Sequence, residues 1–482
     1  MKRSLWVLAG LLVATAMVSA QTTPLQIPAT VRPAAVAYQN GDIKEALRIL
    51  IEIEQENEGD LDVRAWMGFL FLLDGKPDQA EAYLVSVARE RPNDMEVANN
   101  LGSAYLAQGK TQEAIQQFQA VLRSNPKLFQ ANYNVGIAHI QRGEWKEALV
   151  VLSRAADLEP NDAFVRNNMG IALEKLGSNK AAAEEFAKAS NLRPDIESFA
   201  RNAAYAWVRA MSRRNAIPYF ERLLSLNRED VSAVMALGDA YMAIGRDADA
   251  RLLFDRAPDA IHALPAYWLA VGVLRLKEQN LNGAREAFAK GVQIAPDDVD
   301  LLSNLGICEF RLGNHEDALT YFDKAAGLNT GSIEAKVNLA AAYAATGRMD
   351  RAVPLWTEAI NAAPGRTEVR LQLANAMLEL GDLEGARYHF NQVLLIDKNN
   401  PQGHNGMGLY YLRTDQLRQA EAQFRAAIKA NARFEPAYNN LAIALYKADK
   451  TNEAIQTLEQ VLRINPNFAE AKANLDRLRG AE

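Results

Sequence analysis

Cysteine is nearly absent from this chain, whose 482 residues contain only Cys308. A single cysteine cannot form a disulfide within the chain, so the redox chemistry gives no indication of the compartment. We interpret Cys308 as a small buried apolar residue rather than as a reactive thiol.

The chain also lacks a strong charge of either sign. It has 53 Lys and Arg against 59 Asp and Glu, a formal net charge of −6 that becomes −8 without Lys2 and Arg3. A mildly acidic and well-mixed surface argues against nucleic acid and against an anionic membrane face as partners.

Patterns of catalysis and metal binding are missing as well. The five histidines show no metal-ligand spacing, and no glycine-rich phosphate loop is present. We therefore expect no catalytic residues, no metal and no cofactor, and we expect that the protein is not an enzyme. The histidines are His139, His262, His315, His389 and His404.

A long apolar run occurs only at the start of the chain. Lys2 and Arg3 precede apolar residues 5–18, and Val18, Ser19 and Ala20 form a site that a signal peptidase would cleave. This pattern predicts a signal peptide over residues 1–20, a short linker over 21–26 and a periplasmic or secreted protein. An uncleaved anchor is the alternative. No later segment is apolar for eighteen residues, so we expect no membrane span after signal removal.

A period of 34 residues runs through the rest of the chain. Alanine recurs at positions 46, 80, 114, 148, 182, 216, 250, 284, 318, 352, 386, 420 and 454. A glycine or alanine stands twelve residues before each of these alanines, and Leu, Phe or Trp stands four residues after each. Three columns in register cannot arise by chance, so the chain is predicted to be a repeat protein.

Each repeat is predicted to be a helical hairpin. Apolar residues fall at helical spacing on both sides of a turn, as in Tyr105 and then Ala114 and Phe118. Glycine at the turn, such as Gly109, supplies the positive φ that ends the first helix. The small residue and the alanine allow two helix backbones to approach closely, and the large residue fills the space beside them.

These residues resemble the tetratricopeptide repeat (TPR) family. The segment 100–105, followed by Ala114, Phe118 and Pro126, follows the family pattern closely. The resemblance covers residues 27–468 and implies an all-α solenoid of thirteen repeats in a right-handed superhelix, with first helices lining the concave face. Residues 469–482 are predicted to form a capping helix, and residues 256–265, with Pro258 and Pro265, are the best candidate for a bend.

Asparagine recurs at one place in the first helix. The repeats resemble those of O-linked N-acetylglucosamine transferase, where an asparagine ladder at this place grips the backbone of extended peptides; the transferase domain is missing here. The alternative is that each asparagine bonds to the adjacent helix. The column comprises Asn100, Asn134, Asn168, Asn202, Asn304, Asn338 and Asn440.

Two further surfaces are candidates for partner binding. Trp66, Phe69 and Leu73 lie on one face of a first helix and form a possible hydrophobic site, unless Leu25, Ile27 and Val31 bury them. A basic cluster forms a possible site for an acidic partner, unless it pairs with Glu184, Glu185 and Glu221. This cluster comprises Arg201, Arg209, Arg213 and Arg214.

The repeats leave no room for a separate catalytic domain, so binding is the predicted function. We expect a scaffold that binds a protein or an extended peptide segment outside the cytoplasm. The alternative is a structural component of an envelope machine, for polysaccharide export or outer-membrane assembly, that contacts folded partners or glycans. The resemblance names neither the partner nor the oligomeric state.

Overall fold

The computed structural model describes residue 22 and residues 24–480, so the predicted signal peptide lies outside the described residues. In this described part of the chain the regular elements are all helices, as predicted. The helices fall into two compact units, residues up to Ile261 and residues from His262, which are described separately.

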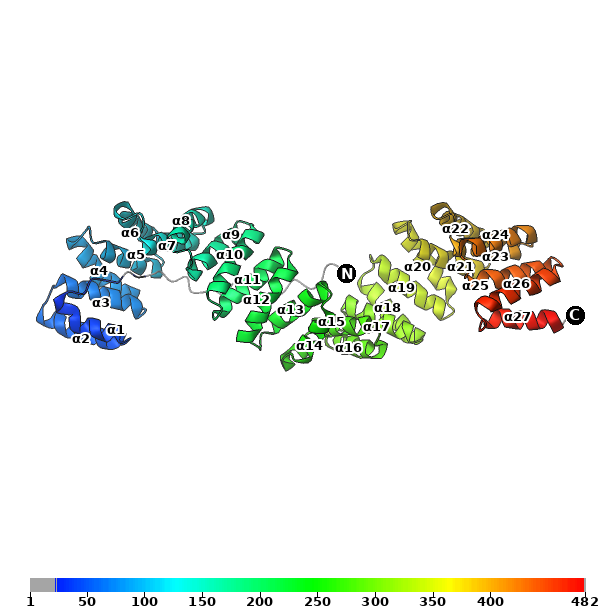
Figure 1. The fold of residues 1–482 in the computed structure, drawn as a ribbon, viewed down its shortest axis with the longest axis horizontal. Helices are drawn as coiled ribbons and strands as arrows, with labels where there is room; N and C mark the ends of the chain where they lie inside the picture. The colour runs from blue at the N-terminus through cyan, green and yellow to red at the C-terminus, as the bar shows by residue number, and fades with distance from the viewer. Residues whose placement is uncertain (1–21, 23, 481–482) are drawn as a thin grey trace. The chain divides into compact units, whose positions relative to one another are not determined.

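The first unit contains seven helical hairpins (Figure 1). A short 3₁₀ helix, η1 (Ala29–Val31), precedes them, and another, η2 (Asp259–Ala263), begins at the end of the unit. The paired helices are α1 (Arg32–Gln39), α2 (Ile43–Glu56), α3 (Leu61–Leu73), α4 (Pro77–Glu90), α5 (Met95–Ala107), α6 (Thr111–Ser124), α7 (Phe129–Gln141), α8 (Trp145–Leu158), α9 (Ala163–Lys175), α10 (Asn179–Leu192), α11 (Glu197–Arg209), α12 (Arg213–Leu226), α13 (Val231–Ala243) and α14 (Asp247–Asp255).

The second unit contains six hairpins and one final helix, so the described residues hold the thirteen hairpins that the period predicts. Its helices are α15 (Pro265–Lys277), α16 (Leu281–Ile294), α17 (Val299–Arg311), α18 (His315–Leu328), α19 (Ile333–Ala345), α20 (Met349–Ala362), α21 (Thr367–Leu380), α22 (Leu383–Ile396), α23 (Pro401–Arg413), α24 (Leu417–Ala430), α25 (Glu435–Lys447), α26 (Thr451–Ile464) and α27 (Ala469–Gly480).

Several first helices begin at an acidic cap, at positions that are 34 or 68 residues apart. The carboxylate of Asp94 accepts a hydrogen bond from the backbone N–H of Val97 at 3.0 Å, which satisfies one of the free donors of the first turn. The same cap occurs at Asp60, Asp162, Asp230 and Asp298, and Ser332 and Asn400 take this role later in the chain.

The three predicted columns form the core. All thirteen alanines have no exposed surface, and the large residues four positions later are at most 3 % exposed. A Cβ atom added to Gly102 would lie 2.6 Å from Cε1 of Phe118. This distance is shorter than a van der Waals contact, so an alanine at position 102 would require the Phe118 ring to shift.

Contacts in both units are local. Each helix packs mainly on its neighbours in the chain, and several first helices also contact the first helix of the next repeat. The final helix α27 packs on α26 and α25 and buries Ala471, Leu475 and Leu478, as predicted for a cap. Cys308 is buried, and burial raises the pKa of its thiol to about 11.

The segment proposed as a bend is irregular. The second helix α14 ends at Asp255 after 9 residues, whereas most second helices have 14, and Pro258 precedes η2. The division between the two units also falls here, after Ile261. A bend at residues 256–265 stays a prediction.

Candidate functional site

The asparagine column lies along the first helices, and its members differ in exposure. Asn100, Asn134 and Asn168 are buried. The remaining four are half-buried; they are Asn202, Asn304, Asn338 and Asn440. The first three side chains are therefore enclosed in this structure, whereas the other four keep some access to solvent.

Several of these asparagines connect one first helix to the preceding one. The amide nitrogen of Asn202 donates to the side-chain oxygen of Asn167 at 2.9 Å, and that of Asn168 donates to the hydroxyl of Tyr133 at 3.0 Å. In the second unit, Asn440 donates to Asn405 at 3.0 Å. In these three bonds donor and acceptor are 35 residues apart, so the same contact recurs between successive repeats.

This geometry bears on both interpretations of the column. Asn134 makes the same kind of bond, to Asn99, at 3.4 Å. Burial raises the pKa of Tyr133, which accepts the bond from Asn168, so its hydroxyl stays protonated. Asn304 instead donates to the backbone carbonyl of Asp300 in its own helix at 2.8 Å. The inter-helix bonds are those of the structural alternative, and ligand binding by the column stays a prediction.

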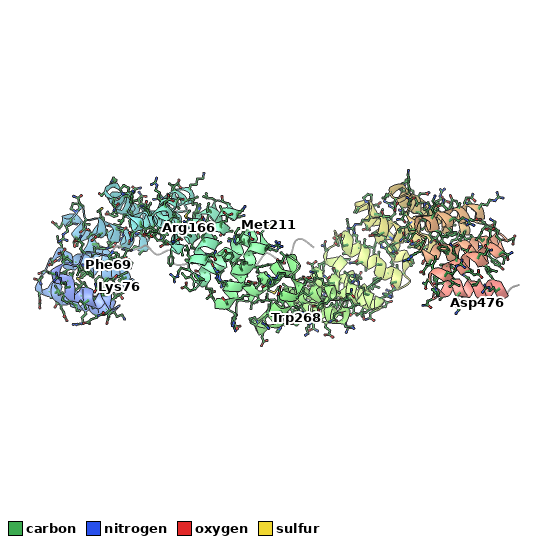
Figure 2. The ribbon with its side chains drawn as sticks, in the orientation of Figure 1. Phe69, Lys76, Arg166, Met211, Trp268 and Asp476 are labelled. Carbon is green, nitrogen blue, oxygen red and sulfur yellow. The ribbon has the colours of Figure 1, made fainter. Side chains whose placement is uncertain are left out.

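The predicted hydrophobic site lies beneath the first described residues of the chain, among them Leu25 and Tyr38. Trp66 and Phe69 are buried and form edge-to-face ring contacts with Tyr38 of α1, while Leu73 is 36 % exposed; Phe69 is labelled in Figure 2. The indole Nε1 of Trp66 donates to the backbone carbonyl of Gln26 at 2.8 Å. A partner would reach both rings only if residues of this N-terminal segment moved away.

The predicted basic cluster is engaged in ion pairs, but not with the acids named above. Arg201 pairs with Glu197 and Asp230, whereas Glu185 pairs with Arg166 and Lys188. The other cluster contacts are Arg209 with Glu174 and Arg213 with Asp239, while Arg214 is exposed and Glu221 accepts a bond from Tyr241. The alternative pairing with Glu184, Glu185 and Glu221 is not observed for Arg201, Arg209 and Arg213, because Glu197 on the same helix and acids on neighbouring elements lie within ion-pair distance instead.

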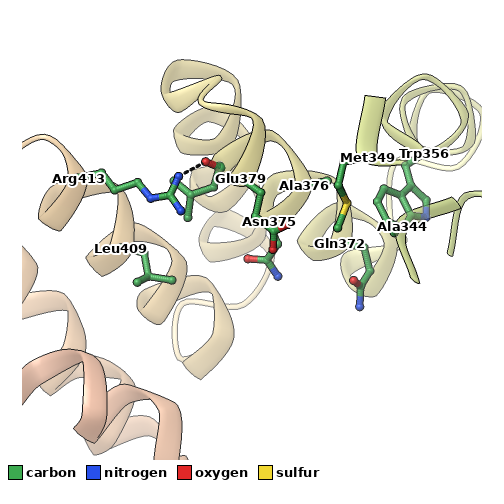
Figure 3. Close-up of a pocket in the computed structure, with 10 residues that line it drawn as sticks. Ala344, Met349, Trp356, Gln372, Asn375, Ala376, Glu379, Leu409 and Arg413 are labelled. Carbon is green, nitrogen blue, oxygen red and sulfur yellow. Dashed lines mark hydrogen bonds between the residues drawn. The ribbon is translucent and has the colours of Figure 1, made fainter. Parts of the chain in front are cut away.

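A hollow in the second unit was missed by the sequence reasoning. It has a volume of about 290 Å³ and is lined by first helices α19, α21 and α23 and by α20 (Figure 3). Gln372, Asn375 and Glu379 are exposed and project from one face of α21, since they lie at i, i+3 and i+7. Gln372 occupies the column position where asparagine stands elsewhere, so a search for asparagine alone passed over it.

Arg413 closes one side of this hollow. It reaches from α23 and donates to the backbone carbonyl of Leu378 in α21. Figure 3 marks this bond with a dashed line from Arg413. Met349 and Trp356 of α20 form the apolar side. The hollow thus combines amide donors and acceptors, one acid, one base and an apolar wall.

Two kinds of site are not found among residue 22 and residues 24–480. The described residues hold no cluster of three or more His, Cys, Asp or Glu side chains able to bind a metal ion. None of the helices described is both long enough and apolar enough to cross a membrane.

Comparison with known proteins gives repeat matches along most of the chain. Models described as tetratricopeptide repeat match residues 70–163, 213–274, 310–409 and 436–468. A chloroplastic tetratricopeptide repeat domain-containing protein, PYG7 of Arabidopsis thaliana, is 34 % identical over 83 residues, which are 17 % of this chain and 28 % of that protein. The peroxisomal targeting signal receptor of Candida glabrata is 29 % identical over 90 residues, which are 19 % of this chain and 15 % of the receptor.

The chain therefore spans less than a third of the length of either relative. Among solved structures, the Cut9–Hcn1 hetero-tetramer of APC/C is similar, with 14 % identity, 94 % of this chain and 96 % of that chain covered, and a TM-score of 0.40.

Proposed function

Since the chain belongs to the tetratricopeptide repeat family, we propose that it is a protein–protein interaction scaffold that binds extended segments of its partners along the first helices. The tetratricopeptide repeat models that match this chain support an interaction scaffold rather than an enzyme. Binding of extended segments is the specific part of the proposal, and the hollow on α21 is the observation that carries it.

The side chains of this hollow suit a peptide backbone. Gln372 and Asn375 each carry a donor and an acceptor, so they can pair with a peptide group whatever the side chains of the ligand are. Neighbouring helices pack about 8–10 Å apart and an extended chain advances about 3.3 Å per residue, so each first helix meets about every third ligand residue. The polar side chains of α21 and α23 therefore suit a sequence-tolerant grip.

A peptide array tests this proposal. An array of unstructured peptides is screened with the full chain, and the affinity of a selected peptide is then measured by fluorescence anisotropy. The double variant Gln372→Ala/Asn375→Ala should bind about tenfold or more weakly, because each hydrogen bond contributes about 0.5–1.5 kcal/mol. Its melting temperature should not change, because both side chains are exposed.

The matched control is Gln419→Ala, which removes an exposed amide from the second helix α24. This variant should bind like the unchanged chain. Equal affinity of the double variant, or binding of folded proteins alone, would argue against the proposal.

We propose further that the protein acts in the periplasm or outside the cell, because residues 1–20 have the pattern of a cleaved signal. The mass of native material should then match a chain that begins at Gln21. Recovery of the full chain with Met1 from a membrane fraction would contradict this location.

A further inference from the structure

The chain's own N-terminal segment lies across two first helices of the first unit. Residues 24–28 belong to no helix and lead into η1. Within this segment the backbone N–H of Gln26 donates to Glu96 Oε2 at 3.3 Å, and its carbonyl accepts from Trp66 Nε1 at 2.8 Å. Trp66 belongs to α3 and Glu96 to α5, the first helices of consecutive repeats.

Side chains thus bind both polar groups of one backbone residue. The side chain of Gln26 itself is exposed, so this contact does not depend on which amino acid stands there. Each of the two helix side chains has only one hydrogen-bonding role, because an indole can only donate and an ionised carboxylate can only accept. The pair therefore recognises an extended backbone in one direction.

The residues around Gln26 add an apolar anchor and stiffness. Leu25 is half-buried and packs on the buried cluster that contains Trp66 and Phe69. Pro24 and Pro28 restrict the backbone on both sides, which lowers the conformational entropy that binding must remove. In contrast, Ile27 is 44 % exposed and contributes little.

From this geometry we infer that Trp66, Glu96 and the apolar surface under Leu25 form a peptide-binding site, and that residues 24–28 occupy it until a partner segment replaces them. The inference rests on the proposed function and gives it a site in the first unit. The partner segment is an extended peptide with an aliphatic side chain, followed by any residue with a free N–H, and flanked by proline.

The contacts of the segment favour exchange rather than permanent closure. The segment contacts the helices through two hydrogen bonds of the Gln26 backbone, one donated and one accepted, and through the half-buried Leu25; the bond to Glu96 lies at the exposed surface. Such weakly held terminal segments open more easily than the repeats beneath them. A tethered segment has an effective concentration of about millimolar, so it lowers the apparent affinity of a partner without preventing binding.

The site is tested with a labelled peptide that copies residues 22–28, Thr-Thr-Pro-Leu-Gln-Ile-Pro. The tethered segment of the full chain is weakened by Leu25→Ser/Gln26→Pro, which removes the apolar anchor and the N–H donor but leaves the helices unchanged. The control Gln26→Ala keeps the N–H. We expect the probe to bind the double variant about tenfold or more tightly than it binds the control.

Changes on the helices test the receiving side. In the background of Leu25→Ser/Gln26→Pro, Trp66→Phe keeps a ring but removes the N–H, and Glu96→Ala removes the acceptor. Each should weaken probe binding about three- to tenfold. A probe methylated on the nitrogen that corresponds to Gln26 should lose the same factor, whereas a probe with alanine at that place should bind normally.

A second measurement covers the case in which the double variant is unstable. A probe with a photoreactive leucine at the place of Leu25 should cross-link to α3 of the unmodified chain at millimolar concentration, and excess unlabelled probe should suppress the product. Absence of this cross-link, or equal probe binding by the double variant and the control, would overturn the inference.

The outcomes separate this inference from the proposed function. Array peptides that bind through Gln372 and Asn375, together with a probe that never binds, would overturn only the site at Trp66 and Glu96. If no array peptide binds the full chain but the probe still binds α3, the site on α21 is overturned and the site in the first unit remains.

Discussion

Met211 occupies a position where the backbone requires the left-handed conformation. Its φ is +59°, and Gly177 and Gly245 stand at the same place in the adjacent repeats with φ of +76° and +80°. Its side chain, labelled in Figure 2, is 85 % exposed, so packing does not offset the cost. We expect Met211→Gly to raise the free energy of unfolding by about 1 kcal/mol, measured by urea denaturation.

Gly177 supplies the matched control for this change. Gly177→Met places a side chain in the same conformation and should lower stability by a similar amount. No difference between the two variants would contradict the strain argument.

His389 is expected to make the stability of the second unit depend on pH. Burial, together with the adjacent Arg370, lowers the pKa of His389, and Asp382 acts in the opposite direction. Arg370 Nη1 lies 3.3 Å from His389 Nδ1 and can only donate, so neutral His389 must accept there. Folding therefore favours the neutral ring.

Because folding favours the neutral ring of His389, protonation at low pH should lower the stability of the folded state. The contribution of His389 to the free energy of unfolding is fully present above its ordinary pKa of about 6.5. It is lost as the pH falls through the lower pKa of the folded state. We expect the free energy of unfolding to decrease between about pH 7.5 and about pH 5, measured by urea denaturation. His389→Gln should remove part of this decrease; an unchanged pH profile would rule out His389 as a contributor.

At the scale of the helices, the approach of the two helices of a hairpin depends on the glycine and the large residue together. Gly102→Ala would place a methyl group against the ring of Phe118 and should lower the free energy of unfolding by about 1–3 kcal/mol. Alanine stands at this position as Ala442 beside Leu458 and as Ala204 beside Phe220, all buried, so alanine is compatible with either partner where the repeat has adjusted to it. In the repeat of Gly102, a leucine at position 118 would leave room for the added methyl group. Adding Phe118→Leu should therefore restore most of the loss, and denaturation of single and double variants measures this coupling.

The final helix is expected to protect the last hairpin. Without residues 469–482, the surface of α26 around Leu458 and Val461, which pack in one buried cluster with α27, becomes accessible. Burial contributes about 25 cal/mol per Å², so a few hundred Å² costs on the order of several kcal/mol locally. Hydrogen exchange should become faster in α25 and α26; unchanged exchange there would contradict the role of α27 as a cap.

At this scale, the sequence predicts a contact well when only one type of residue can make it. Only small residues fit at Gly102 or Ala114, so these columns predicted the hairpins and their core. Another contact joins the fourth residue of several first helices to the carbonyl six residues earlier, as in Asn132 to Pro126 and Tyr438 to Ala432. Arg166, Trp268, Arg370 and His404 make the same contact, so the shared property is a hydrogen bond to a carbonyl and not a residue identity.

For the molecule as a whole, local contacts predict that the repeats do not unfold together. Each helix depends mainly on its neighbours, and such arrays lose their end repeats first. In hydrogen exchange at increasing urea, α3 and α25 should lose protection before α9 and α19. Coincident loss in all four helices would show that unfolding is cooperative along the chain.

The candidate sites were harder to predict than the fold, because exposure depends on neighbours that the period does not specify. Asn100 and Asn304 stand at the same repeat position, yet the first is buried and the second is half-buried. Trp66 and Phe69 were correctly placed on one helix, but only the structure shows that Gln26 bonds to Trp66. The hollow on α21 depends on three first helices together, which no single repeat reveals.

The asparagine bonds between repeats make the building blocks interchangeable. Asn440 donates to Asn405, and Asn474 donates to Asn439, with the same amide groups and the same separation of 35 residues. If residues 406–439 were excised as one block of 34, Asn474 would stand opposite Asn405 and meet an identical oxygen. Duplication or loss of whole repeats by recombination would thus keep the asparagine bond between the repeats that become neighbours. Evolution can therefore change the number of repeats without changing the residues at the contacts between them.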